Sequence, residues 1–226
     1  MHRHRPFALL LNLSVLALAF GWIEATVVVY LREIAGPGSG AIREPLPPVP
    51  IASRLLAMEV AREAWTLVLL GAGGWLAGSR WAERVGAFLL LFGVWDLVYY
   101  GVLKLLLGWP ESLTTWDVLF LIPRPWVAPV WAPALVAAIF VATGTFLLWT
   151  ADRLRRYRPL DAAILLGAAL VVVASFLVES GATGDGRAPS GFPVWLYGSG
   201  VLIGTSWFVR IETRTKAGVE EARPLS

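Results

Sequence analysis

Six apolar segments of this sequence are each long enough to cross the hydrocarbon layer of a membrane, which takes about 20 residues in a helix. Hydrophobic residues make up 57% of the chain and charged residues 15%, whereas roughly 25% of an ordinary soluble domain is charged. The sequence therefore predicts an all-α, polytopic integral membrane protein with a single transmembrane domain over residues 1–226. The six predicted spans are Phe7–Leu31, Leu56–Ala77, Val85–Leu107, Trp131–Thr150, Ala162–Ser180 and Phe192–Val209.

The positions of Lys and Arg predict the orientation of these spans, because positively charged loops resist translocation. With the N-terminus in the cytoplasm, the cytoplasmic segments carry twelve of the 19 Lys and Arg residues and the opposite loops carry five. We therefore expect both termini in the cytoplasm and a multi-pass protein of the bacterial type of inner membrane. Because the basic residues are spread over all cytoplasmic segments, they indicate topology and not a nucleic-acid partner.

The sequence lacks the side chains that bind several common cofactors. It has no cysteine, and its two histidines, His2 and His4, both precede the first span. Haem with histidine ligands, iron–sulfur clusters and zinc bound by His or Cys are therefore not expected. No metal ligands are assigned, and the identity of any other cofactor stays open.

Charged side chains inside the predicted spans are the first candidates for a functional site, since each costs about 2.5 to 3.5 kcal/mol at the centre of a membrane helix. In the second span Glu59, Arg62, Glu63 and Thr66 follow one another at helical spacing and form one polar stripe. In the first span Glu24 is expected at the same depth as Glu63, each about 10 Å from the outer end of its helix. At this common depth the two side chains could meet.

A second polar stripe is predicted on the third span, where Asp96, Tyr99, Tyr100 and Lys104 recur at three- and four-residue spacing. If the first three helices pack together, both stripes surround one pocket that opens to the outside. The acidic residues of the two stripes and Glu24 outnumber Arg62 and Lys104. We therefore expect at least one carboxylate to be protonated or to meet a bound cation.

The loop after the third span is rich in tryptophan and proline and contains Trp116, Asp117 and Arg124. Pro123 and Pro125 prevent a continuous helix, so an interfacial or re-entrant segment on the outer side is expected. Two interpretations remain open. The loop could cover the predicted pocket and place Asp117 and Arg124 at its mouth, or its tryptophans could form an aromatic belt at the membrane interface.

The functional hypothesis is a protein that binds or transports a small solute, a cation or a proton in the outward pocket. Two alternatives stay open: an enzyme that acts on a lipid or isoprenoid headgroup, and a non-catalytic subunit of a larger membrane complex. The expected partners are the lipid bilayer, a small solute or cation and either a second copy or a complex partner. A further alternative is that the buried charges form an ion-pair network that only fixes helix register.

The candidate binding residues are Glu24, Glu59, Arg62, Glu63, Asp96, Tyr99, Tyr100, Lys104, Trp116, Asp117 and Arg124.

Overall fold

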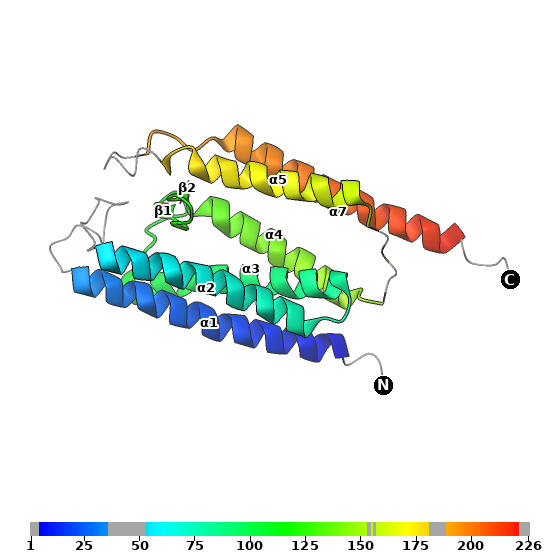
Figure 1. Cartoon of the computed structure of the whole chain (residues 1–226), viewed down its shortest axis with the longest axis horizontal. Helices are drawn as coiled ribbons and strands as arrows, with labels where there is room; N and C mark the ends of the chain where they lie inside the picture. Colours follow the sequence, from blue (N-terminus) through cyan, green and yellow to red (C-terminus); the bar gives the residue numbers. More distant parts are fainter. Residues whose placement is uncertain (1–4, 36–52, 153–154, 156, 181–188, 222–226) are drawn as a thin grey trace. The chain divides into compact units, whose positions relative to one another are not determined.

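The structure, a computed structural model, describes residues 5–35, 53–152, 155, 157–180 and 189–221. Helices account for nearly all regular structure in these residues, and a single two-stranded sheet lies between the third and fourth helices (Figure 1). The prediction of an all-helical fold is therefore confirmed. The elements are α1 (Arg5–Ala35), α2 (Ser53–Ala77), α3 (Trp81–Leu107), β1 (Trp116–Val118), β2 (Val127–Pro129), α4 (Trp131–Trp149), α5 (Pro159–Leu177) and α7 (Val194–Glu221).

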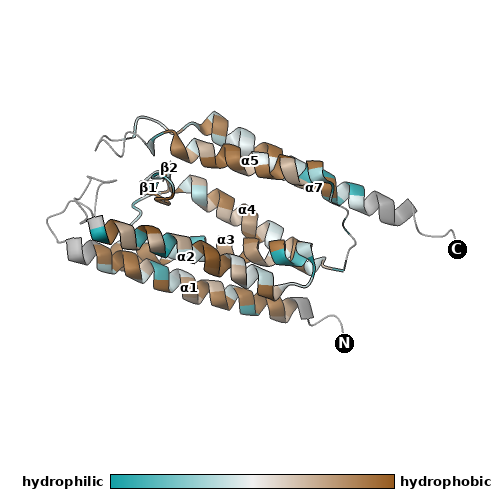
Figure 2. Ribbon diagram, viewed as in Figure 1, coloured by the Kyte–Doolittle hydropathy of each residue, from teal (hydrophilic) through white to brown (hydrophobic). Residues whose placement is uncertain are grey.

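Among the described residues, four helices are long and apolar enough to cross a membrane: Phe7–Leu31 within α1, and the whole of α3, α4 and α5. Their apolar side chains include many that are exposed, among them Leu18 at 53% and Leu166 at 63%. Figure 2 shows that polar residues are more frequent on α2, and on the coloured part of α7 next to its grey end, than on α4 or α5. Exposed apolar helices are the expected exterior of a protein whose solvent is lipid. The chain is therefore compatible with a membrane-embedded, multi-pass protein.

The chain divides into two compact units, which are described separately. The first comprises Met1–Ala151 and Glu179–Ser190, and the second comprises Asp152–Val178 and Gly191–Ser226. In the first unit α3 packs against α1, α2 and α4. One buried apolar cluster joins all four of these helices; its members are Leu13, Ala17, Leu70, Ala87, Leu90, Leu91, Trp95 and Leu148.

Close approach of α3 and α4 depends on glycine. A Cβ added at Gly144 of α4 would lie 2.6 Å from the carbonyl oxygen of Gly86 and 2.6 Å from the backbone nitrogen of Leu90, both in α3. Because backbone atoms cannot move aside as a flexible side chain can, a larger residue at Gly144 would separate the two helices. Small residues at such crossings allow the van der Waals contact that holds membrane helices together.

The segment after α3, which was expected to be interfacial or re-entrant, contains a short β-hairpin. β1 and β2 pair antiparallel, with Asp117 opposite Ala128. The turn between them is closed by a backbone hydrogen bond of 2.7 Å from the Trp126 nitrogen to the Phe120 oxygen, and the Trp126 indole donates to the Ile122 oxygen at 2.8 Å. These bonds satisfy backbone groups that irregular structure would leave unpaired in an apolar environment.

The second unit consists of α5, α7 and adjoining residues. Here α5 packs against α7, and Gly200 of α7 lies against Ala168 and Val172 of α5. Ion pairs occur at the end of this unit where α5 begins. Arg155 donates to Glu212 at 2.6 Å, and Arg214 donates to Asp161 at 2.6 Å. We call Arg155, Asp161, Trp207, Glu212 and Arg214 the α5–α7 cluster.

Candidate functional site

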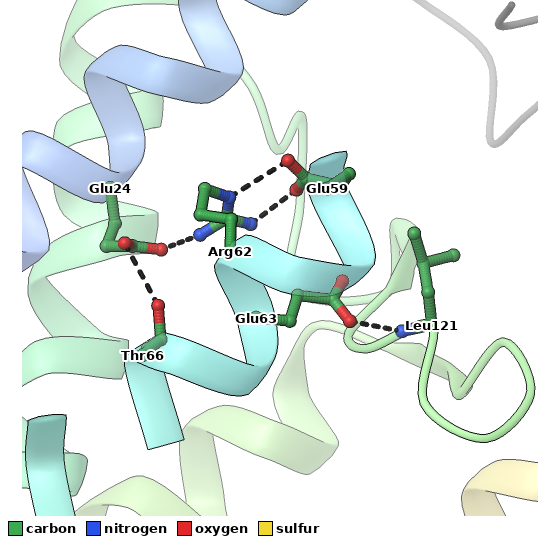
Figure 3. A network of polar contacts seen from close by, with 6 residues as sticks. All are labelled: Glu24, Glu59, Arg62, Glu63, Thr66 and Leu121. Carbon is green, nitrogen blue, oxygen red and sulfur yellow. Dashed lines mark hydrogen bonds and ion pairs between the residues drawn. The ribbon is translucent and has the colours of Figure 1, made fainter. Parts of the chain in front are cut away.

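Arg62 of α2 joins two carboxylates from different helices (Figure 3). Glu59 precedes Arg62 by three residues, so the two side chains lie on the same face of the helix. The Arg62 Nε donates to Glu59 Oε2 at 2.9 Å, and Nη2 pairs with the second Glu59 oxygen. The remaining guanidinium nitrogen, Nη1, pairs with Glu24 Oε2 of α1. Arg62 therefore holds α1 against α2 through a planar, fork-shaped group suited to binding two carboxylates.

Glu24 and Glu63 do not contact each other but take different partners. Glu24 accepts a hydrogen bond of 3.1 Å from the Thr66 hydroxyl, in addition to its ion pair with Arg62. Glu63 points to the hairpin and accepts a hydrogen bond of 2.7 Å from the backbone nitrogen of Leu121 (Figure 3). Both carboxylates are buried, with 4% of Glu24 and 6% of Glu63 exposed. Glu24 contacts Arg62 and Thr66, which flank Glu63 in the sequence. This geometry is compatible with the common depth that was expected for Glu24 and Glu63.

A second set of polar residues connects α3 to the hairpin. The Tyr100 hydroxyl donates to Asp117 Oδ2 of β1 at 2.8 Å. The Asp96 carboxylate, one turn before Tyr100, lies close enough to Asp117 for their charges to interact. We call the whole set the polar cluster; its members are Glu24, Glu59, Arg62, Glu63, Thr66, Asp96, Tyr100 and Asp117.

Asp96 is the member of the polar cluster that lacks a stabilising partner. Within the described part of the chain, no hydrogen-bond donor and no cation contacts its carboxylate, and the charge that acts on it is that of Asp117. Asp96 lies eleven residues before the end of α3 at Leu107, about 16 Å along the helix axis. An ionised carboxylate near the middle of an apolar helix needs a proton, a cation or water to offset the cost of its burial.

The polar cluster contains more acidic than basic groups. Arg62 is its basic member, and its acidic members are Glu24, Glu59, Glu63, Asp96 and Asp117. Within the described ranges, no three acidic or histidine side chains converge as they would to hold a metal ion. Arg62 pairs with Glu24 and Glu59, the Thr66 hydroxyl donates to Glu24, and the Leu121 amide donates to Glu63.

The other predicted site residues lie at different positions. The Lys104 ammonium donates to the backbone oxygens of Gly108 at 3.1 Å and Pro110 at 2.8 Å, so it closes the C-terminal end of α3. Arg124 is exposed at the hairpin turn, and Trp116 is half-buried in β1. Tyr99 lies beside Arg62 and packs against Trp95 and Tyr100, which places it between the two parts of the polar cluster.

Two polar groups near the cluster are not evident from the sequence. The Leu121 amide donates a hydrogen bond to Glu63. Because the donor is a backbone group of an apolar residue, no sequence pattern indicates it. The Trp95 indole nitrogen is buried and has no hydrogen-bond acceptor among the described residues. Trp95 packs against the rings of Phe20 and Phe120, whose centroids are 6.3 Å and 6.4 Å from its own. The α3 tryptophan thus joins α1 to the hairpin beside the charged groups.

Comparison of the chain with protein-family models, with curated protein sequences and with solved structures finds no match. The interpretation of the polar cluster therefore rests on its residues and their contacts.

Proposed function

We propose that this protein binds a proton or a small cation in the polar cluster and couples that binding to the movement of a small solute across a bacterial type of cytoplasmic membrane. In this proposal α2 and α7 also cross the bilayer, giving six spans with both termini in the cytoplasm. The excess of Lys and Arg in the segments that would be cytoplasmic supports this orientation. The polar cluster then lies in the outer half of the membrane and the hairpin lies on the outer side.

The observation that carries the proposal is the position of Asp96. Among the described residues its carboxylate has no donor or cation, and its electrostatic neighbour is the like-charged Asp117. Two neighbouring carboxylates in an apolar environment share a proton or a cation more favourably than both stay ionised, because like charges repel strongly when water is excluded. Acidic residues placed in this way are typical of proton and ion pathways in transporters.

The polar cluster also supplies a route by which such binding could act on the protein. Asp117 belongs to the hairpin and Asp96 to α3, so the charge shared by the two residues sets how strongly β1 is held against α3. Glu63 holds the same hairpin through the Leu121 amide. A proton or cation at Asp96 and Asp117 removes the repulsion between them, while the Tyr100 hydrogen bond stays in place. Binding therefore favours the docked hairpin, and release favours its departure.

The test is proton movement in reconstituted vesicles. Purified protein is placed in liposomes that contain a pH-sensitive dye, and the membrane potential is clamped with potassium and valinomycin. The outside solution is then acidified in the presence of each member of a panel of small solutes. We expect proton uptake that depends on one class of solute. In Asp96→Asn this uptake should fall at least about 100-fold, the lower end of the contribution of one proton-transfer group.

Glu111→Gln is the control for loss of an acid outside the polar cluster, because Glu111 is exposed and follows the C-terminal end of α3. It should retain the wild-type rate. Equal rates for Asp96→Asn and the wild type, with both above the rate of empty liposomes, would contradict the assignment of Asp96. Rates equal to those of empty liposomes across the whole panel would contradict transport.

A further inference from the structure

The surfaces of α5 and α7 change from apolar to charged at the same level of the helix pair. Asp161 of α5 accepts a hydrogen bond of 3.1 Å from the Trp207 indole of α7, which places these two residues side by side. Next to them Leu160 and Val209 are apolar and exposed, at 60% and 58%. Beyond these lie the exposed Arg158 and Arg210. The pair therefore has a common boundary between an apolar surface and a cationic one.

The acidic residues at this boundary are already bound to other groups. Asp161 is 1% exposed and accepts hydrogen bonds from the Arg214 side chain and from the Arg158 backbone nitrogen at 2.8 Å. Glu212 pairs with Arg155, whose side chain is 1% exposed. These acids neutralise cations that are buried or partly buried, and they leave the exposed guanidinium groups uncompensated.

Arg158 and Arg210 are the uncompensated cations. In the residues that the structure describes, neither guanidinium forms an ion pair with an acid. The Arg210 guanidinium lies over the Trp207 ring, 4.7 Å from its centroid, so the ring holds it at the boundary by a cation–π contact. Tyr157, 38% exposed, adds a second amphipathic ring beside Arg155 and Asp161.

We propose that this boundary binds the phosphate group of an anionic phospholipid. Two arginines can donate to one phosphodiester, and Trp207 and Tyr157 are the ring types that settle at the level of lipid headgroups. The exposed apolar side chains above the boundary provide a surface for the acyl chains; they include Leu160, Leu166, Leu170, Leu202, Ile203 and Val209. The site requires that α5 cross the bilayer, but it does not depend on proton binding in the polar cluster.

Native mass spectrometry of the detergent-purified protein tests the site, with phosphatidylglycerol as the probe and phosphatidylcholine as the neutral comparison. We expect phosphatidylglycerol to bind preferentially and its binding to weaken as salt is added. One arginine near an anionic headgroup contributes about fivefold to binding, so the double variant Arg158→Gln/Arg210→Gln should bind phosphatidylglycerol about 25-fold more weakly. The double variant Arg158→Lys/Arg210→Lys retains both charges and should lose much less.

Arg124→Gln is the matched control, since Arg124 is an exposed arginine of the other unit, and it should bind like the wild type. Equal phosphatidylglycerol binding by the double glutamine variant and the wild type would overturn the proposal, as would equal binding of the two lipids. Inorganic phosphate is added as a competitor in a separate series. If it displaces phosphatidylglycerol at equal concentration, the site is one for a soluble anion and the lipid assignment is wrong.

Discussion

The polar cluster and the α5–α7 cluster differ in how their acids and bases are matched. In the α5–α7 cluster Glu212 pairs with Arg155 and Asp161 pairs with Arg214, so each acid has its own guanidinium. In the polar cluster Arg62 pairs with both Glu24 and Glu59, so one guanidinium serves two acids. A matched set of charges is sufficient to fix the packing of two helices. An unmatched set of acids costs stability unless it binds a proton or a cation. This cost supports the function proposed for the polar cluster.

The clusters also differ in which charged group is left without an ion-pair partner when one residue is substituted. A carboxylate that loses its cation can take up a proton and become neutral. A guanidinium that loses its carboxylate cannot lose its proton in a protein. The α5–α7 cluster should therefore be the less tolerant of the two, although it contains fewer charges.

The largest effect is expected for Glu212→Ala. This substitution leaves Arg155 charged, with 1% of its side chain exposed, and without its acid. Breaking a buried ion pair from one side costs about 3 to 5 kcal/mol in the free energy of unfolding. Equilibrium unfolding in mixed detergent micelles measures this loss. Thr213→Ala changes the exposed neighbouring residue and should cost little, while a loss below about 1 kcal/mol for Glu212→Ala would contradict the matched-pair account.

A smaller effect is expected for Arg62→Met. Glu24 and Glu59 lose their shared cation, but each can be neutralised by a proton, so the cost should be about 1 to 3 kcal/mol in the free energy of unfolding. This cost should shrink as the pH falls, because protonation removes the charges that Arg62 would have paired. The loss caused by Glu212→Ala should not shrink in this way.

Unfolding at acidic and at mildly alkaline pH checks the difference between these variants, with Arg124→Met as the control for loss of an exposed arginine. A cost of Arg62→Met that is the same at both pH values would show that the two clusters respond alike.

The smallest effect is expected for Thr66→Val, which keeps the shape of the side chain and removes one hydrogen bond to Glu24. Hydrogen bonds between membrane helices contribute about 0.6 kcal/mol on average. Thr26→Val is the control, because the Thr26 hydroxyl bonds to the Trp22 oxygen of its own helix and does not join two helices. A cost for Thr66→Val above about 2 kcal/mol would mean that Glu24 depends on Thr66 and not mainly on Arg62.

The helices could be predicted from the sequence because hydropathy and charge spacing are local properties. The stripe of Glu59, Arg62 and Thr66 on α2 follows from helical periodicity alone, and the pairing of Glu59 with Arg62 is its direct result. Depth along a helix could also be predicted, since a fixed rise per residue places Glu24 beside this stripe.

The partners of each polar group could not be predicted in the same way. Glu63 binds the Leu121 amide, and this contact depends on the hairpin, whose register is set by backbone pairing between β1 and β2. Lys104 was expected to belong to the second polar stripe and to line the pocket. Its ammonium instead donates to the backbone oxygens of Gly108 and Pro110, which follow the end of α3 and are not paired within the helix. The pairing of Arg155 with Glu212 could not be predicted from a local sequence pattern either, because 57 positions separate the two residues.

Infrared difference spectroscopy during a pH titration measures most directly whether Asp96 and Asp117 share a bound proton. In vesicles free of sodium and potassium, a protonated carboxyl band should appear as the pH is lowered. We predict that Asp96→Asn removes this band and that Asp161→Asn, which changes a matched acid of the other cluster, leaves it unchanged. A band that persists unaltered in Asp96→Asn would contradict the account.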